Sequence, residues 1–115
     1  MTLELLRTSN SKRQEAWPGN EHCDTSFRAI ELAGEVGEAM NKIKKYLRVS
    51  RGIKGKATDS LDLAVLMKEI EMELADVVIC TDLLCAELDI NLAEAVPAKF
   101  NLTSDKVGVN VFYGD

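Results

Sequence analysis

Four acidic residues form two similarly spaced pairs, Glu35 with Glu38 and Glu73 with Asp76. The members of each pair are separated by one helical turn in segments that we predict to be helical, so both carboxylates leave the same face. Carboxylate oxygens are the ligands that hard divalent cations prefer. If the two pairs face one another, their negative charges repel unless such a cation lies between them. The spacing therefore predicts a cation site built from two helices.

The surroundings of the second pair predict that Glu73 and Asp76 are at least partly buried. At about 100° per residue, their helical stripe also contains Glu69 and continues into apolar residues. These apolar residues are Cys80, Leu83 and Leu84. A buried carboxylate without a partner is costly, and a metal ion supplies a partner. The first pair is weaker evidence, because it lies opposite the apolar stripe of its own helix and acids so placed usually form a solvated face. That stripe, predicted to face the core, consists of Ile30, Ala33, Val36, Met40, Ile43 and Leu47.

The choice of ion follows from the other residues that bind metals. A di-iron helical bundle requires Glu-x-x-His pairs, and His22, the single histidine, is not at that spacing from the acids. Cys23, Cys80 and Cys85 also lack the spacing of a zinc site. We expect these cysteines to be reduced thiols, with Cys80 and Cys85 acting as small core residues. The favoured ion is Mg²⁺, with Mn²⁺ as a substitute.

The composition is typical of one globular domain over residues 1–115. Hydrophobic residues make up 46% and charged residues 29% of the sequence, which is an ordinary balance for a chain with its own core. The net charge of −5 argues against a nucleic-acid partner held by a broad basic surface. We find neither a secretory signal nor a segment long enough to span a membrane. We therefore expect a cytoplasmic protein without a nucleic-acid or membrane partner.

The hydrophobic pattern predicts an all-α fold. Helices are expected over residues 2–17, 24–47, 58–88 and 89–100. The basic segment 48–58 is predicted to be a loop, and the alternation over 106–113 indicates a short strand or an extended arm. This divides the chain into an N-terminal helix and turn (1–24), a core with the acidic motifs (25–101) and a C-terminal arm (102–115). Candidate N-cap residues of the last three helices are Asp24, Thr25 or Ser26, then Thr58, Asp59 or Ser60, then Asp89 or Asn91.

The third predicted helix is too apolar for a helix on the surface of a monomer. Its side opposite the acidic stripe is also hydrophobic, and a small all-helical chain has few elements to cover it. The residues concerned are Leu74, Val77, Val78 and Cys85. A second copy of the chain would provide the cover, so we expect a homodimer or a homotetramer arranged as a dimer of dimers.

The order of these motifs resembles the MazG-like family of the all-α nucleoside triphosphate pyrophosphohydrolases, a group that also includes dimeric dUTPases. The likeness lies in an E-x-x-E motif within residues 32–39, an E-x-x-D motif within 73–78 and a tail over 98–108. It covers residues 26–108. The resemblance implies a core of the four-helix-bundle type, assembled as a dimer or a tetramer.

The resemblance also implies an activity. A Mg²⁺-dependent enzyme would cleave an NTP or dNTP between the α and β phosphates, releasing a nucleoside monophosphate and pyrophosphate. Glu35, Glu38, Glu73 and Asp76 would be the metal ligands. A glutamate would also act as the general base, and the motif leaves open whether Glu35 or Glu38 has this role.

Five further residues are candidates for substrate binding. Lys42 and Lys45 continue the stripe of Glu35 and Glu38, and would contact phosphates or form salt bridges within their helix. Lys99 and Asn101 match tail positions that lie near phosphate in the family. Trp17, the only tryptophan, would stack on a base or anchor the core or an interface.

Two alternatives remain open at this stage. The first is a non-catalytic helical module of the same fold that binds a nucleotide or a protein, which is consistent with the long loop and with Gly34, where many members of the family carry an acid. The second is a helical dimer in which the carboxylates only form salt bridges. Magnesium would leave the stability of that dimer unchanged.

Overall fold

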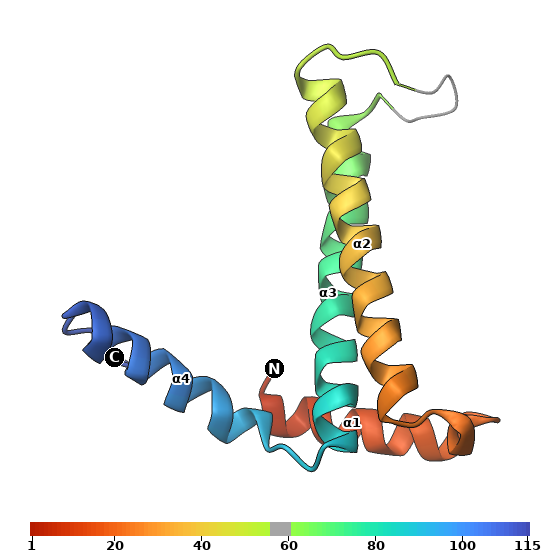
Figure 1. Cartoon of the computed structure of the whole chain (residues 1–115). Coiled ribbons are helices and arrows are strands. Elements are labelled where there is room, and N and C mark those ends of the chain that lie inside the picture. Colours follow the sequence, from red (N-terminus) through yellow and green to blue (C-terminus); the bar gives the residue numbers. More distant parts are fainter. Residues whose placement is uncertain (56–60) are drawn as a thin grey trace.

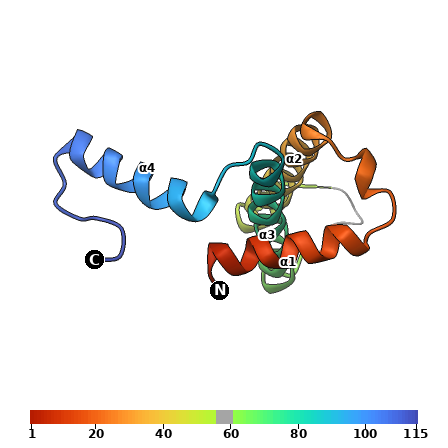
Figure 2. The same ribbon diagram turned by 90° about the horizontal axis from the view of Figure 1, so that it is seen from below.

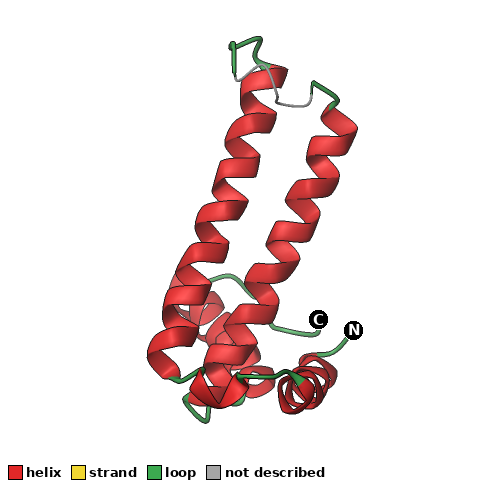
Figure 3. Cartoon of the chain, turned by 90° about the vertical axis from the view of Figure 1, so that its right-hand side faces the viewer, coloured by secondary structure: helices red, strands yellow, loops and turns green. Residues whose placement is uncertain are grey.

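The computed structural model describes residues 1–55 and 61–115 of the chain. These residues form helices and loops without a strand (Figure 3), which confirms the all-α prediction. None of their helices is both long and apolar enough to cross a membrane. The elements are α1 (Leu3–Ala16), the short 3₁₀ helix η1 (Asn20–His22), α2 (Thr25–Ser50), α3 (Leu63–Glu87) and α4 (Leu92–Val107).

The two long helices α2 and α3 run antiparallel, side by side, and form the main body of the molecule (Figure 1). Helix α1 crosses beneath the end of this pair that is distant from the α2–α3 loop, and α4 leads away from it (Figure 2). Within the described chain the four helices therefore do not form a closed four-helix bundle. The buried apolar residues lie on α2 and α3: Ala39, Leu66, Ile70, Cys80 and Leu83.

Each of the four α-helices begins at a polar residue whose side chain accepts a backbone N–H of the first turn. Thr2 caps α1, Asp24 caps α2 and Asn91 caps α4. Asp24 and Asn91 were among the predicted caps. Helix α3 is capped by Asp62, whereas the predicted caps Thr58, Asp59 and Ser60 lie outside the described residues.

Two predicted helix ends were wrong. Helix α2 continues to Ser50, so the first residues of the predicted 48–58 loop are helical. Helix α4 continues past Phe100 to Val107, so the predicted arm begins within a helix. The helix ends at Gly108, whose φ of 73° an L-residue adopts only with strain.

The tail after Gly108 is not a strand, because none of the described segments lies beside it as a pairing partner. Instead the tail folds back on α4. The backbone N–H of Tyr113 donates to Asn101 Oδ1 at 2.7 Å, and the rings of Phe100 and Tyr113 meet edge to face at 6.0 Å.

The apolar stripe of α2 faces outward. Ile30 is 73% exposed, and Val36 and Met40 are also exposed. On α3 the predicted apolar side is likewise uncovered at Leu74 and Val78. The acidic stripe of α2 therefore faces α3. Glu35 is half-buried there, the reverse of the solvated position that the hydrophobic pattern of α2 predicts, whereas Glu38 is exposed as that pattern predicts.

A polar network around the buried Asp82 joins α1, α3 and the α3–α4 connection. Asp82 is fully buried, and its carboxylate accepts from Arg7 Nε and Asn10 Nδ2, both at 3.0 Å. Arg7 Nη2 also donates to the carbonyl of Ile90 at 2.8 Å. Because Ile90 lies in the α3–α4 connection, Arg7 helps to determine where α4 leaves the α2–α3 pair.

Replacing Asp82 with alanine is expected to lower the free energy of unfolding by about 3 kcal/mol, because Arg7 and Asn10 lose their charged partner in the interior. Urea denaturation followed by circular dichroism measures the change. Glu87→Ala, which removes an exposed carboxylate of the same helix, is the control and should change stability by less than about 0.5 kcal/mol. Equal stability of the two variants would show that the network does not hold α1 to α3.

Candidate metal centre and adjoining cavity

Three carboxylates from the two long helices converge at the middle of the molecule. Glu35 projects from α2, and Glu73 and Asp76 project from α3. One oxygen atom of each residue lies within 4.8 Å of the corresponding oxygens of the other two. The i,i+3 spacing on α3 places Glu73 and Asp76 on one face, and the outward orientation of the apolar stripe on α2 turns Glu35 toward them.

Two oxygen atoms of this cluster are buried without a partner. Glu35 Oε2 and Glu73 Oε2 are shielded from solvent and accept no hydrogen bond from any described residue. A buried carboxylate oxygen normally accepts at least one hydrogen bond or coordinates a cation. The three carboxylates and these two free oxygens suit an oxygen-preferring divalent cation such as Mg²⁺. This arrangement is the strongest structural sign of a ligand in the described chain.

The electrostatics of the cluster also indicate that it requires a cation. Burial raises the pKa of Glu35, and the charges of Glu38 and Asp76 raise it further. Burial also raises the pKa of Glu73, again with help from Glu38 and Asp76, while Lys42 opposes the rise. Protons or a cation would relieve this repulsion, and a divalent ion relieves it at neutral pH.

The structure separates Glu38 from the other three predicted ligands. Asp76, which was predicted to be at least partly buried, is exposed, whereas Glu35 and Glu73 are half-buried. The side chain of Glu38 is also exposed and lies outside the converging set, although it interacts with the carboxylate of Glu73. It therefore lies beside the cluster, with access to water. That position suits a proton acceptor as well as a fourth ligand.

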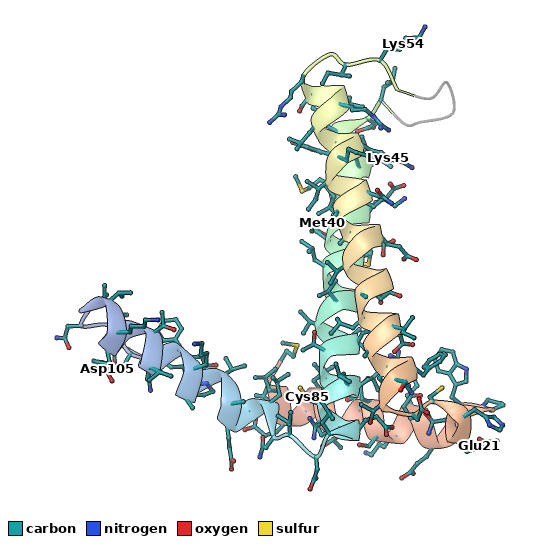
Figure 4. The ribbon with its side chains drawn as sticks, in the orientation of Figure 1. Glu21, Met40, Lys45, Lys54, Cys85 and Asp105 are labelled. Atoms are coloured by element: carbon teal, nitrogen blue, oxygen red, sulfur yellow. The ribbon has the colours of Figure 1, made fainter. Side chains whose placement is uncertain are left out.

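The predicted phosphate contacts are divided between two parts of the molecule. Lys42 lies one helical turn from Glu38 and donates to Glu69 Oε2 at 3.2 Å. Lys45 lies farther along α2, toward the α2–α3 loop (Figure 4). Lys99 and Asn101 are on α4, which leads away from the cluster. The structure thus brings Lys42 close to the acidic residues but does not bring Lys99 or Asn101 there within one chain.

A cavity of about 280 Å³ lies between the acidic cluster and the turn after α1. Its walls include Glu35 and Asp76 of the acidic cluster and Trp17 of the turn after α1. Trp17 is 57% exposed, with the guanidinium of Arg13 at 5.9 Å from its ring centre. This exposure excludes the role of a core anchor and is compatible both with a flat wall for a ligand and with an anchor at an interface.

Several lining residues were missed by the sequence reasoning: Gln14, Asn20, Phe27, Arg28 and Glu31. They come from α1, η1 and the start of α2, which meet only in the folded chain. The only local signal was the i,i+3 spacing of Arg28 and Glu31, a common pattern on helices. Their convergence therefore could not be predicted from the sequence.

The three cysteines are free thiols, as expected. Cys23 and Cys80 line the cavity. Burial and the nearby charges of Glu31, Glu35 and Asp76 raise the pKa of Cys80 to about 11. Cys80 is therefore a protonated, unreactive wall residue at neutral pH rather than a nucleophile.

Comparison with protein-family models, with curated proteins and with solved structures found no match to this chain.

Proposed function

We propose that this protein is a Mg²⁺-dependent nucleoside triphosphate pyrophosphohydrolase, which cleaves a (d)NTP between its α and β phosphates. The observation that carries the proposal is the convergence of Glu35, Glu73 and Asp76 from two facing helices, with two buried oxygens that have no partner among the described residues. The order of the acidic motifs along the chain adds support.

In this proposal each acidic residue has a distinct task. Glu35, Glu73 and Asp76 hold the ion through oxygen atoms that already lie close together. Bound Mg²⁺ would neutralise phosphate charge and polarise the phosphoryl group. Glu38, exposed beside the cluster, accepts the proton of the attacking water. Its access to solvent favours it over Glu35 as the general base.

Two hollows on opposite sides of the acidic cluster suggest which way the base and the phosphates of the substrate would point. The cavity with Trp17 has the flat apolar wall that a nucleobase requires. A second hollow, of about 330 Å³, is lined by Glu73 together with Lys42 and Lys68. The base would occupy the first, and the β and γ phosphates would extend past the ion toward the two lysines. Lys42 would then leave its ion pair with Glu69 and bind a phosphate instead.

The direct test is pyrophosphate release from a panel of NTPs and dNTPs, with Mg²⁺ and with EDTA. Metal-dependent release of pyrophosphate and the nucleoside monophosphate is the expected result. Binding of Mg²⁺ and nucleotide by the folded protein without turnover would instead establish the non-catalytic binding module. Release of inorganic phosphate in place of pyrophosphate would show cleavage at a different bond.

We also propose that a second copy of the chain completes a bundle of the four-helix type. The exposed apolar faces of α2 and α3 would then pack against a partner, since exposed faces of this kind mark interaction surfaces. A homodimer would cover one such face, and a homotetramer would cover more. In either assembly Lys99 and Asn101 would be free to approach the acidic cluster of another copy.

Met40→Lys is expected to shift the protein to the 12.7 kDa monomer, because it places a charge in the middle of the proposed interface. Light scattering after size exclusion measures the mass, and the unmodified protein should have at least twice the monomer value. Asn41→Lys introduces the same charge at the neighbouring exposed position and serves as the control. A monomeric unmodified protein would refute the assembly.

A further inference from the structure

Arg28 is a buried cation at the wall of the cavity. It is only 4% exposed. Its Nη1 donates to Glu31 Oε1 at 2.9 Å, and its Nη2 donates to Gln14 Oε1 at 2.8 Å and to Asn20 Oδ1 at 3.0 Å. Arg28 and these three partners all line the same cavity as Trp17. Arg28, Gln14 and Asn20 also line another hollow of about 230 Å³, which Glu31 and Trp17 do not line. The cluster lies at the η1 end of the molecule, which Glu21 marks in Figure 4.

The chemistry of arginine determines how the two amides are oriented. A guanidinium group has only donors, so the carbonyl oxygens of Gln14 and Asn20 must face it. Their NH₂ groups are consequently directed elsewhere. No described residue accepts a hydrogen bond from Gln14 Nε2 or Asn20 Nδ2. Each amide therefore has two donors available for a ligand.

The planar fork of Arg28 also determines the order of the hydrogen-bonding groups. One nitrogen, Nη2, holds both amides, whereas Nη1 holds Glu31. The two amide oxygens therefore lie side by side at one nitrogen and the carboxylate lies at the other, and we take the attached NH₂ groups to follow the same order. A ligand that matches this order has two adjacent acceptors followed by a donor.

Among the common nucleobases, cytosine and guanine have such an edge. Cytosine presents O2, N3 and the N4 amino group in this order, and guanine presents N7, O6 and N1–H. Uracil and thymine present an acceptor, a donor and an acceptor. Adenine presents one acceptor, N7, beside its N6 amino donor.

We propose that Arg28 is a positioning residue that directs the amide donors of Gln14 and Asn20 into the cavity, so that the site selects cytosine and guanine nucleotides over uracil, thymine and adenine nucleotides. This selectivity rests on the proposed function, because it assigns the cavity to the base of the substrate. Trp17 supplies a stacking surface that any base can use. The polar cluster of Arg28, Gln14, Asn20 and Glu31 distinguishes one base from another.

The test is kcat/KM for dCTP and dUTP, and for dGTP and dATP, in the unmodified protein. The members of each pair are similar in size and differ in the order of donors and acceptors. We expect ratios of at least about tenfold in favour of dCTP and dGTP, since a mismatched base leaves a donor or acceptor unsatisfied. Turnover of all four at similar rates would overturn the inference and leave the proposed function intact.

Gln14→Glu tests the role of the amide. The carboxylate keeps its bond to Arg28 but has no N–H, so the dCTP/dUTP ratio should fall toward one while the melting temperature is unchanged. Arg28→Lys should also lower the ratio, because one ammonium group cannot hold the three partners in a planar order. Lys12→Gln, on the exposed side of α1, should keep the original ratio. An unchanged ratio in Gln14→Glu would refute the assignment.

If the protein hydrolyses none of these nucleotides, the proposed function fails and the selectivity is measured by binding. Isothermal titration of dCTP and dUTP with Mg²⁺ then gives the two dissociation constants. Tighter binding of dCTP by about tenfold or more would support the role of Arg28. Equal constants, or no binding of either nucleotide, would overturn it.

Discussion

Asp76→Asn is expected to lower kcat/KM for pyrophosphate release about a hundred- to a thousandfold. The amide keeps the size of the carboxylate but removes one of the three charges that converge in the cluster. Glu38→Gln is expected to lose a similar factor for a different reason, because the amide cannot accept the proton of water. A coupled assay for pyrophosphate, with saturating Mg²⁺, measures both variants.

The two variants differ in their response to Mg²⁺. Asp76→Asn should need more Mg²⁺ for half-maximal activity, because it has lost a ligand. Glu38→Gln should keep nearly the original requirement if its role is that of base. Glu87→Gln, an exposed change of the same type on α3, should retain full activity. Full Mg²⁺-dependent release by both Asp76→Asn and Glu38→Gln would show that the site assignment is wrong.

Magnesium is expected to raise the melting temperature, and this increase should be larger at higher pH. A ligand that binds only the folded state adds about 2.7 kcal/mol to stability at one hundred times its dissociation constant. The cluster suits such binding because Glu35 Oε2 and Glu73 Oε2 lack a partner among the described residues. Differential scanning fluorimetry over a series of Mg²⁺ concentrations and pH values measures the effect.

The sign of the pH dependence follows from the raised pKa values of Glu35 and Glu73. Between the ordinary value of 4.5 and the raised value, the folded state holds more protons than the unfolded state. The contribution of these groups to stability is therefore fully present below the ordinary pKa and is lost as the pH rises through the raised one. Without metal, this contribution disappears as the cluster ionises. Mg²⁺ replaces the protons, so it stabilises the protein most at pH values at which Glu35 and Glu73 have lost their protons.

Glu73→Gln separates the metal site from a set of ordinary salt bridges. The variant removes one charge from the repelling group, so the metal-free protein should be more stable near neutral pH than the unmodified protein. It should also lose most of the response to Mg²⁺. Calcium is a useful second probe, since it prefers the same oxygen ligands. An unmodified protein whose melting temperature does not respond to Mg²⁺ at any pH would support the salt-bridge interpretation.

The elements of this fold were largely predictable from local patterns. Caps such as Asp24 and Asn91 and the periodicity of the apolar residues act over one or two helical turns, so the sequence around each helix indicates its presence. The spacing of Glu73 and Asp76 likewise places both on one face of a helix. The ends were less predictable. Helix α4 continues to Val107 and ends before Gly108, whose left-handed backbone conformation terminates the helix.

The direction in which each helix faces could not be predicted in the same way. The apolar stripe of α2 indicated that Ile30 and Met40 would face the core, yet both are exposed and Glu35 faces α3 instead. Periodicity identifies the two faces of a helix but not which neighbour each face meets. That choice depends on all the surfaces that compete for burial, including those of another copy of the chain.

The acidic pairs and the tryptophan could be identified from the sequence, because helical spacing and residue type are recognisable from a few neighbouring residues. The polar wall of the cavity was not visible, because Gln14, Asn20 and Arg28 belong to three separate elements and become neighbours only through long-range packing. Arg28 shows the physical reason most clearly. On its helix it is an ordinary partner of Glu31, and it orders a binding surface only where α1 and η1 bring two amide oxygens to the other nitrogen of its guanidinium group.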